Sequence, residues 1–402
     1  MPTTFPEIHH NSDQGSRAGE RGALHCHAEN PLGGDMKSER GQGLLKKVDL
    51  FLGGAFLYVL GAIFKKRSVP SDYSTVGIFA FAAIGDSILS SFLISEIRRL
   101  SNVSKVVVFA SRSNAGIYEL FKGFDRIVIV PVTNPFMAIR RVREFEVDIL
   151  IDTSQWPRIS AILAALTRSK FTIGFKTRSQ FRHYAYDACV EHDSNVHEVD
   201  NFRKLLRPLG VESRESPRIT NDVQAAEAPR IASERYVVFH PWASGTNSAM
   251  REWPLNYWCN LAGTLIEKGY TVVITGGPGD SDRAEDLRRQ IGGGQVINAA
   301  AKFGFLGIAE IINRAACVVC VNTGIMHLSA MLDTPMISLH GPTNPLRWGP
   351  VSKERGVLAV SEREGGMYLN LGFEYPKKPE YLMDKISVDA VVNALRLEYS
   401  II

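Results

Sequence analysis

The sequence is poor in cysteine and has no strong excess of charge of either sign. Its 402 residues include five cysteines, and 46 Lys and Arg residues stand against 42 Asp and Glu residues, for a formal net charge of +4. So small an excess does not indicate a nucleic-acid partner. With 45% hydrophobic and 22% charged residues, the composition excludes a polytopic membrane protein and a wholly disordered chain. We expect a globular protein of two domains, or three.

Two of the cysteines have the spacing of a metal or redox motif. Cys317 and Cys320 form a CxxC, but it lies inside the apolar run ACVVCV, where residues three apart along a strand point to opposite faces. Neither a second CxxC nor a His pair completes a set of metal ligands. We therefore expect a buried strand here, no metal site, and a reducing compartment. GxGxxG and GxxxxGK[ST] are also missing from a dinucleotide or P-loop context, so neither a dehydrogenase nor a P-loop NTPase is favoured.

A hydrophobic run near the start of the chain is too short to span a membrane. Leu50 to Phe64 gives 15 uncharged residues between two basic clusters, fewer than the roughly 20 that a spanning helix needs. One interpretation is a helix over 46–68 that lies in the membrane interface, with its basic ends on anionic lipid. The other is a helix packed on the main body. Residues 1–45 lack any apolar period, and we expect them to be disordered.

Residues 74–211 and 235–383 each alternate apolar runs with amphipathic segments, which predicts parallel βαβ units. The polar stretch 212–234 predicts a linker, and 384–402 a C-terminal helix with Ser387 as N-cap. The expected strands are 76–81, 105–110, 126–130, 147–152, 171–174, 236–240, 271–275, 295–298, 316–321, 336–340 and 357–360. The expected helices between them are 87–100, 114–122, 135–145, 158–168, 255–268, 281–291, 305–315 and 325–332. The prediction is thus an α/β protein with two doubly wound, Rossmann-like domains that face a central cleft.

In the second domain, four expected strands end in loops rich in Gly, Ser, Thr or Asn. Asn322, Thr323 and Gly324 stand where a strand turns into a helix, whose free N–H groups favour phosphate. Arg251 adds a forked, permanent charge that suits a diphosphate. Asp280 follows another strand, where a carboxylate could accept hydrogen bonds from ribose hydroxyls. We expect these loops to form one binding rim.

Each of these residues also has a purely structural interpretation. Gly277, in TGGPGD, lets the backbone approach a ligand closely, but loops at strand ends use glycine for turns in any case. Asn322 or Thr323 can simply cap a helix. His327, in the first turn after Gly324, is as readily a packed or capping histidine as a ligand.

In the first domain, Gly85 permits a tight turn after the first strand, and Asp86 begins the following helix. If Asp86 is simply the N-cap of this helix, its contribution to stability is an ordinary one, about 1 kcal/mol. Its position at the carboxyl end of a strand also points it toward the expected cleft. Position alone therefore favours neither of two roles for Asp86, a helix cap or a catalytic base. Asp152, at the end of VDILID, is a weaker candidate of the same kind.

The motifs AAIGDSILSSF, HPWASG with the later REWP, TGGPGD, VNTGIMHLSAMLDTP and GPTNPLRWGP occur in this order between Asp49 and the C-terminal helix. Together they resemble glycosyltransferase family 9, the lipopolysaccharide heptosyltransferases and their relatives. The resemblance implies a GT-B fold with an N-terminal acceptor domain and a C-terminal nucleotide-sugar domain. It also implies inverting transfer with no obligatory metal or other cofactor.

The resemblance assigns roles to particular residues. The family's proposed catalytic base falls on Asp86. Its donor-binding residues fall on Ser244, Gly245 and Thr246 in the phosphate loop, Arg251 as the basic residue, Asp280 at the ribose, and Asn322, Thr323, Gly324 and His327 in a turn of the form Asp-(Ser/Thr)-Gly-x-x-His. Arg251 replaces the usual Lys and changes its reach, and Asn322 replaces a carboxylate expected near the donor sugar. Because of this replacement heptose is not assumed, and the expected sugar is heptose or a related one.

The expected reaction moves that sugar from a nucleotide diphosphate, with ADP-heptose favoured, to lipopolysaccharide or another cell-surface glycan. The expected partners are the donor, a lipid-linked saccharide acceptor and the inner-membrane surface, which implies a cytoplasmic protein bound peripherally to the inner membrane. One rival is a nucleotide-sugar epimerase or hydrolase on the same fold. The other is a non-catalytic, membrane-associated glycan-assembly protein, which Asn322 favours and Asp86 disfavours.

Overall fold

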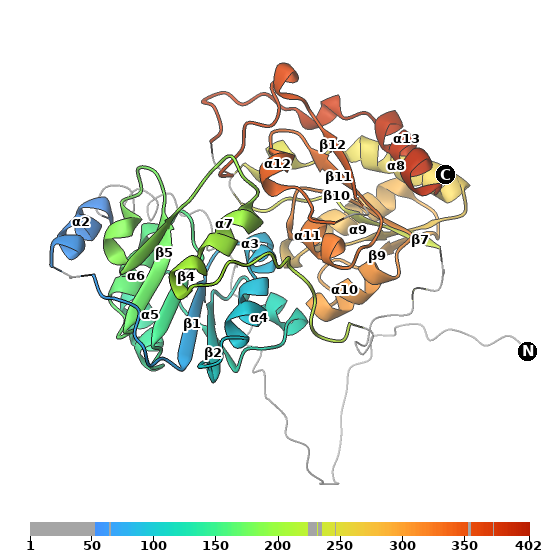
Figure 1. The fold of residues 1–402 in the computed structure, drawn as a ribbon. Coiled ribbons are helices and arrows are strands. Elements are labelled where there is room, and N and C mark those ends of the chain that lie inside the picture. Colours follow the sequence, from blue (N-terminus) through green and yellow to red (C-terminus); the bar gives the residue numbers. More distant parts are fainter. Residues whose placement is uncertain are drawn as a thin grey trace, which may run out of the picture. The chain divides into compact units, whose positions relative to one another are not determined.

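The computed structural model describes residues 53–63, 66–223, 231, 235–245, 247–352, 355–372 and 374–402. All of them belong to one compact unit, Ser38–Ile402. Two parallel, six-stranded sheets form the frame of this unit, one in each half of the described chain (Figure 1). Residues 1–45, for which we expected disorder, lie outside the described residues, as do residues 224–230 and 232–234 of the expected linker.

The first sheet has the strand order β3-β2-β1-β4-β5-β6. Its strands are β1 (Thr75–Ala80), β2 (Lys105–Ala110), β3 (Arg126–Ile129), β4 (Ile149–Asp152), β5 (Phe171–Lys176) and β6 (Ala188–Glu191). Its helices are α3 (Ile84–Leu89), α4 (Phe92–Arg98), α5 (Pro135–Arg143), α6 (Arg158–Ala165) and α7 (Glu198–Lys204), with the 3-10 helices η2 (Ala115–Leu120), η3 (Arg182–Ala185) and η4 (Arg207–Leu209). The central strands are buried on both faces, as the continuous apolar runs predicted.

The second sheet repeats this arrangement with the order β12-β11-β10-β7-β8-β9. Its strands are β7 (Tyr236–His240), β8 (Thr271–Ile274), β9 (Val296–Asn298), β10 (Cys317–Val321), β11 (Met336–His340) and β12 (Arg355–Ala359). Its helices are α8 (Leu255–Glu267), α9 (Ser281–Ile291), α10 (Phe305–Asn313), α11 (Gly324–Met331), α12 (Pro345–Trp348) and α13 (Val388–Tyr399), with the 3-10 helices η5 (Ser248–Arg251), η6 (Pro278–Asp280), η7 (Glu362–Glu364) and η8 (Met383–Lys385). Ser387 caps α13, as expected, by accepting a hydrogen bond from the N–H of Ala390 at 3.2 Å.

Both orders are those of a doubly wound sheet, in which the chain works outward from one strand and then returns to its other side. The reversal falls between β1 and β4 in the first sheet and between β7 and β10 in the second. Ligands of such sheets bind at this point, beyond the carboxyl ends of the strands. The loops after these four strands are therefore the first place to look for a site.

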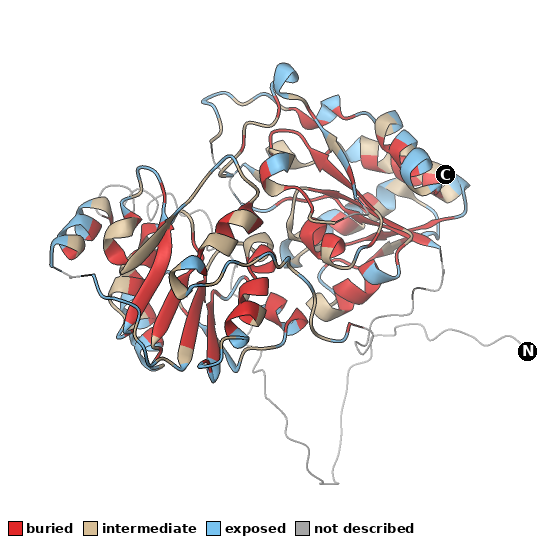
Figure 2. Cartoon of the chain, in the orientation of Figure 1, coloured by how far each residue is buried: buried red, intermediate tan, exposed pale blue. Residues whose placement is uncertain are grey.

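The central strands of the second sheet are buried (Figure 2), and the CxxC motif lies in one of them, β10. Cys320 belongs to the cluster of buried apolar residues on one face of the second sheet, and Cys317 to the cluster on the other face. Both thiols are free and buried, and burial raises the pKa of each well above its ordinary value. The prediction of a buried strand is confirmed.

Some elements differ from those expected. The single helix predicted over 87–100 is two helices, because the hydroxyls of Ser90 and Ser91 bond to the carbonyls of Asp86 and Ile88 at 2.8 and 2.7 Å and interrupt the helix. The segment expected as a helix over 114–122 is the 3-10 helix η2. Strand β6 and helix α7 were not predicted.

The hydrophobic segment near the start of the chain contains the helix α2 (Gly54–Ile63), which packs on α6 and η3. Leu57 and Leu60 are buried there, whereas Tyr58 and Ile63 are 63% and 69% exposed. The helix therefore packs on the first domain along one stripe and leaves a second apolar stripe exposed (Figure 2). Within the described part of the chain, no helix is both long and apolar enough to cross a membrane.

Candidate active site

Asp86 lies in the first turn of α3, directly after β1. It is the third residue of the helix rather than its N-cap, and its Oδ2 accepts a hydrogen bond from the N–H of the N-cap residue Ala83 at 3.0 Å. Its Oδ1 lies 3.1 Å from Nε2 of Gln155, which follows β4. One carboxylate oxygen therefore caps the helix while the other faces the reversal point of the first sheet, so capping and a chemical role do not exclude each other.

Helix α3 meets helix α11 of the second domain where both begin. A Cβ on Gly324 would lie 2.7 Å from Cγ2 of Ile84, and a Cβ on Gly85 would lie 3.2 Å from Cδ2 of His327. Only glycine allows so close an approach at these positions without a shift of the neighbours. The two glycines bring the carboxyl end of β1 next to the N-terminus of α11.

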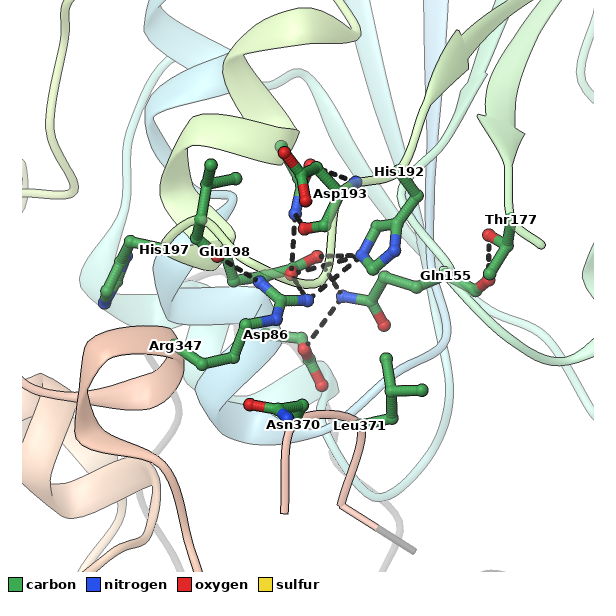
Figure 3. A network of polar contacts seen from close by, with 12 residues as sticks. Asp86, Gln155, Thr177, His192, Asp193, His197, Glu198, Arg347, Asn370 and Leu371 are labelled. Carbon is green, nitrogen blue, oxygen red and sulfur yellow. Dashed lines mark hydrogen bonds and ion pairs between the residues drawn. The ribbon is translucent and has the colours of Figure 1, made fainter. Parts of the chain in front are cut away.

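A network of polar contacts begins at Asp86 and reaches the second domain (Figure 3). Nε2 of Gln155, which binds Asp86, also donates to Oε1 of Glu198 at 2.8 Å. Glu198 forms an ion pair with Arg347 of α12, and Arg347 donates from NH1 to the carbonyl of Val196 at 3.0 Å. Both charged side chains are almost completely buried. The network therefore links the base candidate of the first domain to a cation of the second.

The surroundings of Glu198 keep it ionised although it is buried. Burial alone would raise the pKa of this carboxyl, but the contact with His192 and the charge of Arg347 outweigh burial, and the net pKa is lowered. Nε2 of His192 lies 3.3 Å from both carboxylate oxygens and 3.1 Å from NH2 of Arg347. Since one ring nitrogen cannot donate to Glu198 and accept from Arg347 in the same tautomer, only one of these contacts is a hydrogen bond at a time.

Asn322, Thr323 and Gly324 lie where β10 turns into α11, as expected. Nδ2 of Asn322 donates to the carbonyl of Trp348 at 3.1 Å, a contact that an acceptor-only aspartate could not make. Thr323 is the N-cap of α11 but makes no side-chain cap bond, and its Oγ1 has no partner among the described residues. The N-terminus of α11 thus lies at the reversal point of the second sheet, with its first N–H groups and the buried hydroxyl of Thr323.

The loop after β7 carries Ser244, Gly245 and Arg251. NH2 of Arg251 donates to the backbone carbonyl of Ser244 and closes the loop, and Gly245 has a φ of +95°, which favours glycine. Ser244 and Gly245 are exposed. Thr246, the third residue assigned to this loop, lies outside the described residues.

Asp280 and Gly277 follow the neighbouring strand β8. Oδ2 of Asp280 accepts from the N–H of Gly277 at 2.9 Å, and its Oδ1 lies 3.7 Å from NH1 of Arg283. Partial burial raises the pKa of Asp280. Because β8, β7, β10 and β11 are neighbours in the sheet, their loops lie in a row at one edge, where we expected a binding rim.

Two residues lie in packed environments. His327 is buried against Gly85, and burial lowers its pKa to about 3, so its ring is neutral at pH 7. Asp152, the weaker base candidate, is fully buried in an ion pair with Arg182 at 2.8 Å and accepts from the hydroxyl of Tyr186 at 2.6 Å. Its carboxylate is committed to these contacts, and the expectation of a base at Asp152 is wrong.

Sequence reasoning missed Gln155, Glu198 and Arg347. Gln155 comes just after a predicted strand, and Arg347 lies in the quoted motif GPTNPLRWGP, so both had a signal in their position. Glu198 lies in a helix that was not predicted. Among the described residues, no group of three or more His, Cys, Asp or Glu side chains is arranged to hold a metal ion.

Comparisons with known proteins point to one family. The model of glycosyltransferase family 9 (heptosyltransferase) matches residues 136–367. Lipopolysaccharide heptosyltransferase 1 of Escherichia coli (strain K12) is 30% identical over 181 residues, which are 43% of this chain and 53% of that protein. The chain thus spans about half the length of the curated relative it matches.

Solved structures share the fold. The glycosyl transferase family 9 protein from Veillonella parvula superposes with a TM-score of 0.66 at 19% identity, over 83% of this chain and 99% of that one. E. coli heptosyltransferase WaaC with ADP gives a TM-score of 0.64 at 21% identity, over 80% and 99% of the two chains. These likenesses confirm the predicted α/β, GT-B architecture with two Rossmann-like sheets.

Proposed function

The chain belongs to glycosyltransferase family 9, and from this premise we propose that it is an inverting glycosyltransferase. The donor is a nucleotide diphosphate sugar and the acceptor a hydroxyl of lipopolysaccharide or another cell-surface glycan. The curated relative is named a lipopolysaccharide heptosyltransferase, which makes ADP-heptose and a lipid-linked saccharide the first pair of substrates to test.

In the proposed reaction, the acceptor hydroxyl attacks the anomeric carbon of the donor sugar from the face opposite the diphosphate. A carbon–oxygen bond forms to the acceptor as the bond to the diphosphate oxygen breaks, which inverts the anomeric centre. Asp86 takes the proton of the attacking hydroxyl, a role typically worth about 10²–10⁴-fold in rate. Negative charge develops on the leaving diphosphate, which Arg251, the Ser244–Gly245 backbone and the N-terminus of α11 stabilise.

The contact between α3 and α11 is the observation that carries this proposal. Gly85 lies against His327 and close to Gly324, so the first turn of α3, which carries Asp86, packs directly on the N-terminus of α11. A proton acceptor and an anion-binding helix terminus are the two groups that transfer from a nucleotide diphosphate needs.

Asp86→Asn tests the proposal, since the amide keeps the shape of the side chain and loses its basicity. We expect transfer of heptose from ADP-heptose to fall at least about 100-fold, while ADP binding measured by calorimetry stays near that of the wild type. Asp389→Asn, an exposed substitution on α13, is the control. Transfer by Asp86→Asn close to the wild-type rate would refute the base, and nucleotide release without an acceptor would favour a hydrolase.

We also propose that the protein works at the cytoplasmic face of the inner membrane. Support comes from α2, whose exposed apolar stripe includes Phe56, Tyr58, Val59 and Ile63. Lys66 and Arg67 follow the helix, and Arg67 binds Asp187 through NH2 at 2.8 Å, which holds this end of the segment on the first domain. Apolar side chains next to basic residues suit an anionic lipid surface, where a lipid-linked acceptor would be found.

A further inference from the structure

We propose that Gln155 is a positioning residue for Asp86, and that the ion pair of Glu198 and Arg347 ties its position to the contact between the two domains. The inference rests on the proposed role of Asp86 as base and adds what holds that base in place. Gln155, Glu198 and Arg347 act through Asp86 and do not bind the substrate in this proposal.

The amide of Gln155 stands between two carboxylates. Its Nε2 lies 3.1 Å from Oδ1 of Asp86 and 2.8 Å from Oε1 of Glu198, and an amide nitrogen has two protons to give. The reversed amide would place its oxygen against both carboxylates, so the two acceptors fix its orientation. With Oδ2 held by the N–H of Ala83 at 3.0 Å, both oxygens of Asp86 have a fixed donor, and the plane of the carboxylate is set.

Glu198 is itself held firmly. It is the first residue of α7, where the helix N-terminus favours a negative charge, and Nδ2 of Asn201 donates to its Oε2 at 3.3 Å. Arg347 supplies the positive charge that makes burial of this carboxylate tolerable, because an uncompensated buried charge is strongly unfavourable. Glu198 thus offers Gln155 a charged acceptor whose position does not vary while Arg347 is in place.

Arg347 comes from the other domain, and it does not act alone there. Its NH1 binds the carbonyl of Val196, and Nε2 of His197 lies 3.0 Å from the carbonyl of Gly349. Val196 and His197, the two residues before Glu198, are therefore joined to Arg347 and to Gly349 at the C-terminal end of α12. If the two domains separate, Glu198 loses its counter-charge and keeps only its first-domain contacts with His192 and Asn201. The acceptor that orients Gln155 is then held less firmly, so we expect the base to be aligned best while the domains are in contact.

Gln155→Leu tests the positioning role, because it removes the donor from a half-buried side chain and keeps the approximate volume. Misplacement of a reacting group by about 1 Å can cost about 100-fold, so we expect kcat to fall about 10- to 100-fold while KM for the donor changes less than about two-fold. Gln290→Leu, on the exposed side of α9, is the control. Equal kcat values for Gln155→Leu and the wild type would overturn the inference.

The tie to the domain contact is tested with Arg347→Met and the double variant Gln155→Leu with Arg347→Met. If Arg347 acts through Gln155, the double variant is no slower than the slower single variant, since two changes in one chain of contacts are not additive. Rate losses that multiply would overturn the coupling. Arg347→Lys keeps the charge, and we expect it to recover part of the kcat that Arg347→Met loses. If Arg347→Met does not fold, Arg347→Lys takes its place in the comparison.

Asp86→Asn is assayed in the same series to separate the two ideas. If Asp86→Asn is inactive and Gln155→Leu has the wild-type kcat, the proposed function stands and the inference fails. If Asp86→Asn keeps wild-type transfer, or the wild type transfers nothing, the proposed base fails and the inference falls with it.

Discussion

At the scale of single residues, His327 shows how a residue of a motif can be held by packing. Its ring lies against Gly85 and is 5% exposed, and burial, followed by the nearby His197 and His340, lowers its pKa to about 3. A neutral ring supplies no charge to a diphosphate at pH 7. We therefore expect His327 to shape the contact between α3 and α11, and its protonation to oppose folding.

The buried ring of His327 makes the stability of the protein depend on pH. The unfolded chain binds a proton at His327 near the ordinary pKa of about 6.5, whereas the native protein binds it near pH 3. The contribution of neutral His327 to the free energy of unfolding is therefore fully present above pH 6.5. It falls as the pH decreases, by up to about 1.4 kcal/mol per pH unit. We expect urea unfolding between pH 6.5 and 4.5 to show a shallower slope for His327→Gln than for the wild type. His240 and His340, which are also buried with lowered pKa values, stay in both proteins, so equal slopes would contradict this account of His327.

At the scale of elements, α2 has a packed stripe and an exposed apolar stripe, which bear on the two interpretations that the sequence left open. One stripe, with Leu57 and Leu60, is part of the buried cluster that covers a face of the first sheet. The other is exposed, and the helix is only 10 residues long. Such a helix is anchored by the protein on one side and has apolar side chains free for a lipid surface on the other.

Replacing Tyr58 and Ile63 together by Glu should abolish binding to vesicles. Both side chains are more than half exposed, so the fold is expected to tolerate them, while two negative charges oppose an anionic surface. The measurement is sedimentation with vesicles of anionic phospholipid against purely zwitterionic ones, at low and high salt. Leu397→Glu, a substitution of an 81% exposed residue on α13, is the matched control and should bind as the wild type does. Equal binding of all three proteins would exclude α2 as the contact.

The elements also show what the sequence could and could not predict. Strands such as β2 and β10 were found because their apolar runs are continuous and both faces are buried. Strand β6, ACVE, is a short edge strand with a polar end, and α7, EVDNFRK, is only seven residues long and largely polar. Their periodicity was too weak to see, and Glu198 was missed with them.

The candidate site divides in the same way. Asp86, Arg251 and Asn322 follow strands, so their edge of the sheet could be predicted from order along the chain. The partners of these residues could not. The contact of Asn322 with the carbonyl of Trp348 and the approach of Gly324 to Ile84 depend on how loops from separate strands meet, and periodicity carries no information about that.

At the scale of the whole described unit, the two sheets share one buried cluster. It contains Val76 and Ile88 from the first domain together with Val318 and Met326 from the second. Neither domain can unfold without exposing this shared cluster and the buried pair of Glu198 and Arg347 to water, so we expect the two domains to unfold together. A ligand held by loops of the second domain is then expected to stabilise both domains together.

Nucleotide binding should therefore raise the stability of the whole unit. At a concentration of 100 times Kd, a ligand that binds only the native state adds about 2.7 kcal/mol to the free energy of unfolding. We expect ADP to shift the entire thermal transition more than UDP or GDP does.

Arg251→Ala should weaken ADP binding about 10- to 100-fold, because a hydrogen bond to a charged group is worth about 1.5–3 kcal/mol. Arg289→Ala, which removes a 67% exposed side chain of α9, controls for the loss of one positive charge. If ADP shifts the thermal transition of Arg251→Ala as much as that of the wild type, the diphosphate binds elsewhere. If UDP shifts the wild-type transition more than ADP does, the donor nucleotide is UDP and the role of the phosphate loop stands.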